Sequence, residues 1–258
     1  MLINETIIRK ELSKIIRSSL NEAFNRSELS ISEERRVVDN FEQVEKMMEF
    51  ASTDDFYFVQ IIKRRKDNRR EDTSKGNYHA GGWYLDGWRV HSVQELEHLK
   101  PTIIASCEKN NARAYITINT RSDKATDAQI IKVRSMYPKW DPRNIHADAI
   151  VPAQAKHGYN WKGQRLRFFI DIDSTNPKIW DECKKIITMC GMVPLGEYVT
   201  PNGGLHILMP NKEDPNIDYL LHMLHKFDNW IDKGKLALAH PNFDGKIILY
   251  SNIDTMGY

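Results

Sequence analysis

The stretch Phe168-Phe169-Ile170-Asp171-Ile172-Asp173 predicts a buried strand that carries two carboxylates, and it decides the fold expected for the second half of the chain. Side chains of a strand alternate between its two faces. Phe168, Ile170 and Ile172 therefore share one face, whereas Asp171 and Asp173 share the other. Carboxylate oxygens are the ligands that magnesium and manganese prefer. The pair is thus a candidate for holding a divalent cation.

The segments around this strand predict a complete small sheet with two helices. The expected elements are a strand at 166–173, a helix at 178–190, strands at 197–200 and 205–209, a helix at 217–231 and a last strand at 246–250. The order β-α-β-β-α-β is the split βαβ arrangement of ferredoxin-like or RNA-recognition-type (RRM-like) sheets. Helices cover one face of such a sheet, which leaves the other face free for function.

The first half of the chain predicts a second unit, so we expect two lobes. The expected division is a helical prefix at 1–50 with helices at 4–25 and 31–50, an N-terminal α/β lobe at 51–150, and the RRM-like catalytic lobe at 151–258. Prolines and glycines between 138 and 164 mark the join. Within the first lobe, residues 83–90 predict a strand or a hairpin with Asp86-Gly87 at its turn. The expected fold class is α/β (α+β), with the two lobes packed together.

Length and composition restrict the classes of protein to consider. The chain has 258 residues, of which 41% are hydrophobic and 28% charged, as is typical of soluble globular proteins. No apolar run approaches the roughly 18 residues of a membrane span, and residues 1–10 lack a signal-peptide core. We therefore expect a cytoplasmic protein without a membrane partner. The three cysteines show no C-x-x-C spacing, so a zinc site or a disulfide framework is not expected.

A basic segment, which we define as residues 63–70, interrupts an otherwise balanced charge distribution. The net charge is only +2, but this segment has six cations and one anion, Asp67; the cations are Lys63, Arg64, Arg65, Lys66, Arg69 and Arg70. Such a cluster can neutralise phosphates of a nucleic acid. Trp83, Tyr84 and Trp88 follow in the chain and could stack on bases. The alternatives are a solvated loop for the cations and a core position for the aromatic residues.

A histidine on the strand at 205–209 completes the candidate site. His206 alternates with Leu205 and Ile207, so it can share a face with the carboxylates and donate a hydrogen bond to a phosphate. Backbone amides of Gly203 and Gly204 in the preceding turn could do the same. Arg167, on the carboxylate side of its strand, could neutralise phosphate or pair with an aspartate. Each residue taken singly also has a structural explanation, as a strand end, a packed histidine or a turn.

The Asp-x-Asp strand, followed by a glycine turn and a histidine strand, resembles the archaeo-eukaryotic primase superfamily, which includes primase-polymerases of phages, plasmids and mobile elements. The resemblance covers roughly residues 110–258. It implies that Asp171 and Asp173 bind Mg²⁺ or Mn²⁺ and that His206 contacts the triphosphate of the incoming nucleotide. Arg113 and Arg121 could also meet that triphosphate. The implied partners are nucleoside triphosphates and a nucleic-acid template, with single-stranded DNA as the expected one.

The chain departs from the family pattern at two places. The family's histidine motif is commonly S-x-H, whereas Gly204 occupies the serine position here. A third acidic residue normally lies on the last strand, but residues 247–250 have none. Asp244 and Asp254 flank that strand, and we take Asp254 as the third metal ligand. The chain has no G-x-x-x-x-G-K-[ST] motif, so a replicative helicase is expected as a separate partner.

The resulting hypothesis is a metal-dependent nucleotidyltransferase of DNA replication, a DNA primase or primase-polymerase. The alternative is a catalytically degenerate, primase-like module that only binds nucleic acid or nucleotide, because a third carboxylate is missing from the last strand. A replication-initiator nuclease can share this sheet topology. Such enzymes usually require a His-x-His pair and a nucleophilic tyrosine, and the single His206 in its strand argues against that class.

Overall fold

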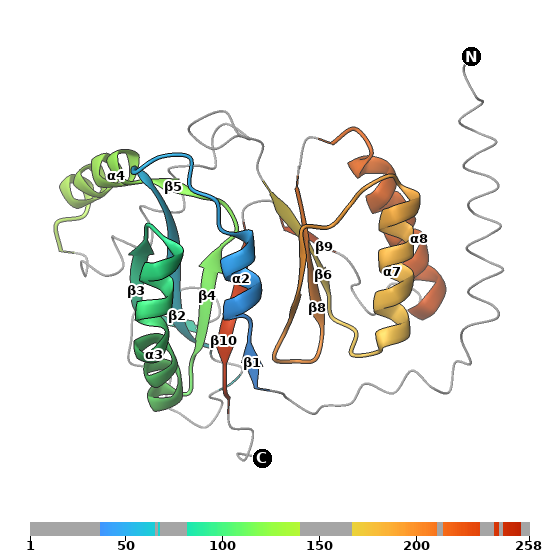
Figure 1. The fold of residues 1–258 in the computed structure, drawn as a ribbon, viewed down its shortest axis with the longest axis horizontal. Helices are drawn as coiled ribbons and strands as arrows, with labels where there is room; N and C mark the ends of the chain where they lie inside the picture. The colour runs from blue at the N-terminus through green and yellow to red at the C-terminus, as the bar shows by residue number, and fades with distance from the viewer. Residues whose placement is uncertain are drawn as a thin grey trace.

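The computed structural model describes residues 37–64, 67, 82–139, 167–210, 214–232, 240–242 and 245–253. Two sheets lie side by side, and helices pack against both of them (Figure 1). Every strand pair among these residues is antiparallel. The predicted mixed α/β class is therefore confirmed.

The first sheet has the strand order β1-β10-β4-β2-β3, and a short strand β5 also pairs with β2. Its strands are β1 (Val38–Asp39), β2 (Asp55–Arg64), β3 (Gly82–Val90), β4 (Arg113–Thr117), β5 (Arg121–Ser122) and β10 (Lys246–Ser251). Its helices are α2 (Phe41–Met47), α3 (Val93–Asn110) and α4 (Asp123–Met136). Serine side chains cap two of the helices: Ser92 accepts from the Glu95 amide at α3, and Ser122 accepts from the Ala125 amide at α4.

The second sheet has the order β7-β8-β6-β9. Its strands are β6 (Phe168–Ile172), β7 (Gly196–Val199), β8 (Leu205–Met209) and β9 (His240–Asn242), and its helices are α7 (Pro177–Met189) and α8 (Ile217–Asp232). Asn176 caps α7, and Pro177 takes the first helical position, where a missing N–H does no harm. The positive φ of Gly191, 74°, turns the chain soon after α7 ends.

The strand predicted at 246–250 forms, but its place in the second sheet was predicted wrongly. It is β10, and it lies between β1 and β4 in the first sheet. β9 is the strand that pairs with β6 instead. Ile247 and Leu249 are buried with Ile116 of β4 in the core of the first lobe. Alternation shows that such residues are buried, but it does not show which sheet buries them.

One helix is shorter than predicted, and one pair of alternatives is decided. In the described part of the helix predicted at 31–50, residues 37–50, the chain forms β1 and the seven-residue α2, because it first pairs with β10. Of the two alternatives predicted for residues 83–90, a strand and a hairpin, the strand is confirmed. Position 87 of that strand requires glycine, because a Cβ there would lie 2.7 Å from the Val59 carbonyl oxygen. The helix predicted at 4–25 lies outside the described residues.

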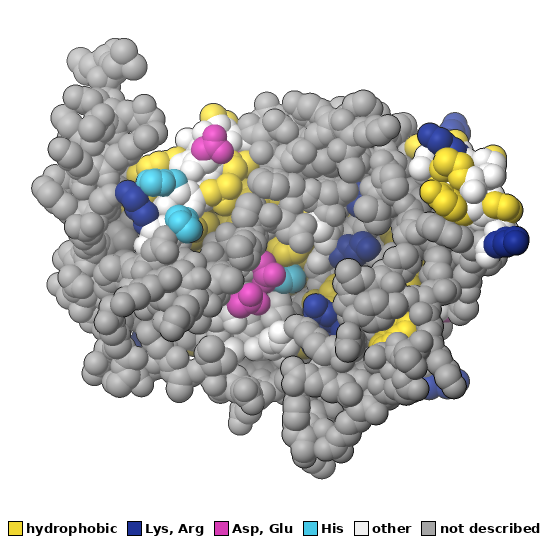
Figure 2. Space-filling view, turned by 180° about the vertical axis from the view of Figure 1, so that it is seen from behind, with side chains coloured by type: hydrophobic (Ala, Val, Ile, Leu, Met, Phe, Trp, Pro, Cys, Tyr) yellow, Lys and Arg dark blue, Asp and Glu magenta, His cyan; other side chains and the backbone are white. Residues whose placement is uncertain are grey.

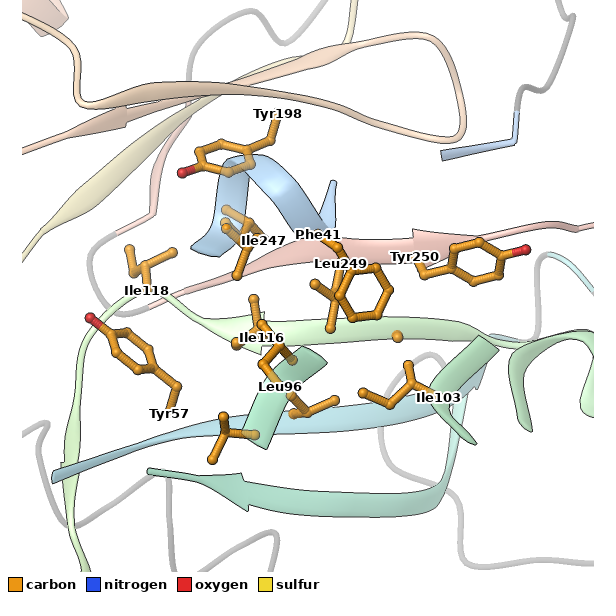
Figure 3. Packing of buried hydrophobic residues seen from close by; sticks show 14 of the residues in the cluster. Phe41, Tyr57, Leu96, Ile103, Ile116, Ile118, Tyr198, Ile247, Leu249 and Tyr250 are labelled. Carbon is orange, nitrogen blue, oxygen red and sulfur yellow. The ribbon is translucent and has the colours of Figure 1, made fainter. Parts of the chain in front are cut away.

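Most of the buried hydrophobic residues form two large cores, beside a smaller cluster of Phe56 and Phe58. The first lies between the second sheet and its helices α7 and α8. The second joins the first sheet, α2 and α3 to Phe169, Tyr198 and Leu208 of the second sheet. Figure 3 shows Tyr198 extending toward α2 and Ile247. The face of the second sheet that is opposite its helices is therefore only partly free, because the first lobe covers a portion of it.

Polar contacts also fix the two sheets relative to each other. The side-chain amide of Asn40 donates to the Val199 carbonyl of β7 at 3.1 Å and to the Ile248 carbonyl of β10 at 2.9 Å. The side-chain amide of Asn119 donates through Nδ2 to the Arg167 carbonyl and accepts at Oδ1 from the Arg167 amide. The accessible part of the face thus has a defined position at the junction of the two lobes. No helix in the described part of the chain is long and apolar enough to span a bilayer.

Candidate functional site

Asp171 and His206 form the centre of the candidate site. They lie directly opposite each other on the neighbouring strands β6 and β8. His206 Nε2 lies 3.2 Å from Asp171 Oδ1. The residues that alternate with them, Ile170 and Ile207, are buried in the core beneath α7 and α8. The structure therefore brings these two residues together on the face opposite the helices.

The ring of His206 is held on one face by Phe169 and at its Nε2 edge by Asp171. It stacks on Phe169, with ring centroids 4.4 Å apart and ring planes inclined by 23°. Only 10% of the His206 side chain is exposed, and its Nδ1 is buried with no hydrogen-bond partner among the described residues. The Asp171 side chain is 37% exposed. Among the described residues, Nε2 is thus the ring nitrogen that has a partner, the carboxylate of Asp171.

A second carboxylate follows at the end of the same strand. Asp173 is exposed and lies one alternation beyond Asp171. Figure 2 shows acidic side chains directly beside a histidine in the middle of one face, with Lys and Arg atoms nearby. Two accessible carboxylates suit a hard cation such as Mg²⁺, whose remaining ligands are oxygen atoms of water or phosphate. Among the residues that the structure describes, no three His, Cys, Asp or Glu side chains are grouped to hold a metal.

The third metal ligand is not identified by the described residues. Asp244 and Asp254, the two acidic candidates, both lie outside them. The register instead places His240 of β9 directly opposite Asp171. Sequence reasoning missed this position because it assigned the last strand of the sheet to residues 246–250. His240 could have been found only by knowing that β9 pairs with β6, and this pairing is a property of the folded chain.

The turn through Gly203 and Gly204 lies close to β6, but its backbone amides already donate hydrogen bonds within the turn. The Gly203 amide donates to the Thr200 carbonyl at 2.9 Å, and the Gly204 amide donates to Thr200 Oγ1 at 3.0 Å. Both predicted phosphate-binding amides are therefore used within the turn. A Cβ on Gly204 would lie 2.4 Å from the Ile172 carbonyl oxygen. This close approach explains why glycine stands where the primase pattern has serine.

The three predicted arginines lie in other environments. Arg167 donates to the Met47 carbonyl and to Glu49, both at 2.7 Å, so it pairs with a glutamate rather than with an aspartate of the site. Arg113 is 1% exposed and forms an ion pair with Asp67. Arg121 is also 1% exposed, on β5. Burial of these side chains opposes direct contact with a triphosphate in this conformation.

The basic segment and the aromatic residues are partly described. Lys63 and Arg64 end β2 and are half-buried, and Arg64 donates to the Tyr115 hydroxyl at 3.3 Å. Arg65, Lys66, Arg69 and Arg70 lie outside the described residues. Trp88 packs against the core of the first lobe, and Tyr84 packs against a buried phenylalanine pair, as the core alternative predicted. Trp83 lies opposite Lys63 in the register.

Tyr198 is the aromatic hydroxyl directly opposite His206 on β7. It is 1% exposed, and burial raises the pKa of its phenol to about 12. A phenol that stays protonated at neutral pH and is screened from solvent is a poor nucleophile. This tyrosine therefore does not supply the nucleophile that an initiator nuclease requires.

No known protein family, curated protein or solved structure matches the chain.

Proposed function

We propose that the protein is a metal-dependent nucleotidyltransferase, a DNA primase or primase-polymerase of the phage or mobile-element type. The observation that carries the proposal is the Asp171–His206 pair, 3.2 Å apart on the helix-free face, with exposed Asp173 beside it. The strand order β7-β8-β6-β9, with helices α7 and α8 on one side, supports an RRM-like split βαβ sheet. The cations at the end of β2 support a nucleic-acid template as partner.

The carboxylates of the site suit Mg²⁺ or Mn²⁺. Asp171 and Asp173 would hold the ion through oxygen atoms that water can already reach. A bound ion neutralises triphosphate charge and supports in-line attack of a 3′-hydroxyl on the α-phosphate. Asp171 also orients His206, since it accepts from Nε2 and fixes the edge of the ring. When Asp171 turns its carboxylate toward a bound ion, the Nε2–H of His206 would become available to a phosphate oxygen, while the stack on Phe169 keeps the ring in place.

The decisive experiment is nucleotide incorporation on a single-stranded DNA template with Mg²⁺ or Mn²⁺, both with and without a primer. The double variant Asp171→Asn/Asp173→Asn removes two charges without changing side-chain size, and we expect loss of incorporation. Asp181→Asn, on the exposed side of α7 in the same lobe, is the matched control and should retain activity. Incorporation at the original rate by the double variant would refute the proposal.

A second candidate is a primase-like module that binds without catalysis. Two observations favour it: no three-ligand group occurs among the described residues, and the turn amides are already used. This module would bind nucleotide or nucleic acid but incorporate no labelled nucleotide. His240→Ala helps to separate the two candidates, because its register position opposite Asp171 makes it a position to test for a third ligand. Loss of incorporation but not of DNA binding in that variant favours the enzyme.

A further inference from the structure

The imidazole of His206 has little freedom to move. It stacks on Phe169, which is itself buried, and only 10% of the His206 side chain is exposed. Because β8 lies between β6 and β7, the backbone at His206 is paired on both sides, with Asp171 and with Tyr198. The Tyr198 hydroxyl donates to the Gln43 carbonyl of α2 at 3.4 Å, which ties this neighbour to the first lobe. A ligand of the site must therefore meet the ring where it lies.

The hydrogen-bond donor of this ring is already used by Asp171. Nδ1 is buried, and Nε2 lies 3.2 Å from Asp171 Oδ1. A carboxylate at this distance selects the form of the ring that carries a hydrogen on Nε2. The carboxylate oxygen thus takes the position that a phosphate oxygen needs in order to accept from Nε2, and its negative charge repels an anion. Asp171 and an anionic ligand therefore compete for one donor.

Asp171 is the movable member of the pair. Its side chain is 37% exposed, against 10% for His206. Its backbone lies inside the second sheet, because β6 pairs with β8 on one side and with β9 on the other. The strand is therefore fixed, and rotation of the Asp171 side chain to another staggered conformation is the movement that separates the two groups.

The position of Asp173 gives the direction of that rotation. Asp173 follows Asp171 along β6, whereas His206 lies across the strand, on β8. Residues that are two apart in a strand are separated by about 6.8 Å. When the Asp171 carboxylate shares a cation with Asp173, it is directed along β6 and leaves Nε2. Binding of the cation and release of the Nε2–H are then one movement.

We infer that the Asp171–His206 contact is a switch that makes phosphate binding depend on the metal ion. Asp171 turns from Nε2 to a bound divalent cation, and the released Nε2–H donates to a phosphate oxygen. Without the cation, Asp171 blocks the phosphate position by occupancy and by charge. The inference rests on the proposed function, because it takes a divalent cation and a triphosphate as the ligands of the site. It adds an order to their binding, and by linkage each ligand raises the affinity for the other.

The first test follows His206 in the unmodified protein. Nuclear magnetic resonance of histidine-labelled protein detects the Nε2–H proton, and His206→Phe identifies its signal. We expect Mg²⁺, added without any nucleotide, to move this signal from its hydrogen-bonded position and to speed its exchange with water. A signal that keeps its position and exchange rate at saturating Mg²⁺ would overturn the inference, because Asp171 would then still hold Nε2.

The second test releases His206 by substitution and uses inorganic tripolyphosphate as the probe, with EDTA present and at about 0.1 M salt. Asp171→Ala removes the competing carboxylate. We expect calorimetry to show an affinity about tenfold higher than that of the unmodified protein, the effect of one hydrogen bond to a charged group. Asp173→Ala is the matched control, because it removes the same charge from an exposed position and leaves the Asp171–His206 contact intact.

The control separates the switch from a simple change of charge. Asp173→Ala should raise the affinity for tripolyphosphate about threefold or less, as is typical of an exposed charge. Equal gains in the two variants would overturn the inference, as would tripolyphosphate binding by neither. If Asp171→Ala does not fold, the resonance of His206 in the unmodified protein decides the matter.

A double variant shows whether the gain passes through His206. In Asp171→Ala/His206→Phe, the new phenylalanine keeps an aromatic ring on Phe169 but has no N–H. The tenfold gain in affinity for tripolyphosphate should therefore disappear. A double variant that keeps the gain would overturn the inference, because the anion would then bind without this donor.

Failure of the inference can be distinguished from failure of the proposed function. If Mg²⁺ releases the Nε2–H and Asp171→Ala binds tripolyphosphate without metal, but no nucleotide is incorporated, the inference stands and the polymerase proposal fails. If incorporation requires Asp171 and Asp173 but Mg²⁺ leaves the His206 signal unchanged, the reverse holds.

Discussion

Phe169 and His206 stack face to face across two strands, with ring centroids 4.4 Å apart. The contact lies where the core shared by the two lobes meets the half-exposed carboxylate of Asp171. One side of the imidazole therefore belongs to the hydrophobic interior, and its Nε2 edge belongs to the site. This division allows a substitution in the core to change the site without touching a charged residue.

Phe169→Leu should loosen the imidazole. We expect a loss of about 1–2 kcal/mol of unfolding free energy from the lost stacking and buried area, and weaker nucleotide binding because the ring is no longer held. Phe168→Leu is the matched control, since Phe168 is equally buried but faces α7 and α8. Denaturant unfolding and nucleotide titration check both variants. Equal nucleotide affinity in the two variants would show that the stack does not position His206.

Gly204→Ser, which restores the serine of the primase pattern, should destabilise the fold. The new Cβ would lie 2.4 Å from the Ile172 carbonyl oxygen, so β6 and the turn must separate. We expect a loss of about 2–3 kcal/mol, as for other overpacking changes. Gly191→Ala has open space around its Cβ but a φ of 74°, and it should lose only about 1 kcal/mol through backbone strain. Thermal unfolding distinguishes the two, and a stable Gly204→Ser would contradict this description of the turn.

Asn40→Ala should weaken the junction of the two sheets. The Asn40 side chain donates to the carbonyls of Val199 and Ile248, and its loss leaves these acceptors without that donor. We expect a loss of about 1–3 kcal/mol in urea unfolding. Asn110→Ala removes a single bond to Ser106 within α3 and should have a smaller effect. A junction that depended only on apolar packing would give equal losses for both.

Alkaline pH should destabilise the protein partly through Tyr198. Burial raises the pKa of its phenol from 10.0 to about 12. Below pH 10 the phenol is protonated in both states, so it adds no pH dependence. Between pH 10 and about 12 the unfolded chain loses this proton first, and stability falls by about 2–3 kcal/mol. Tyr198→Phe should remove this part of the decline in unfolding free energy; an identical alkaline profile would contradict the prediction.

Several local features were predictable because they depend on neighbours in the chain. The strands β6 and β8 form where alternation predicted them, and Asp171 and His206 occupy the face opposite the apolar residues. The helix at 177–189 begins and ends within two residues of its predicted bounds, because its apolar stripe and Gly191 are local signals. The prediction that Asp171 and His206 share a face required only the two-residue period of a strand and the correct pairing of β6 with β8.

Other features depend on contacts between residues far apart in the chain. The assignment of β10 to the first sheet and the pairing of Arg113 with Asp67 both depend on such contacts. An alternating apolar strand fits either sheet equally well, and a buried arginine looks in sequence like a solvent-exposed one. The sequence by itself determined which apolar residues of β6 and β8 face the core and which face carries the carboxylates, because side-chain period is a local property. Only the tertiary structure decided which strands pair and which charged side chains form ion pairs, because several strands and several charged residues in the sequence could serve equally well as partners.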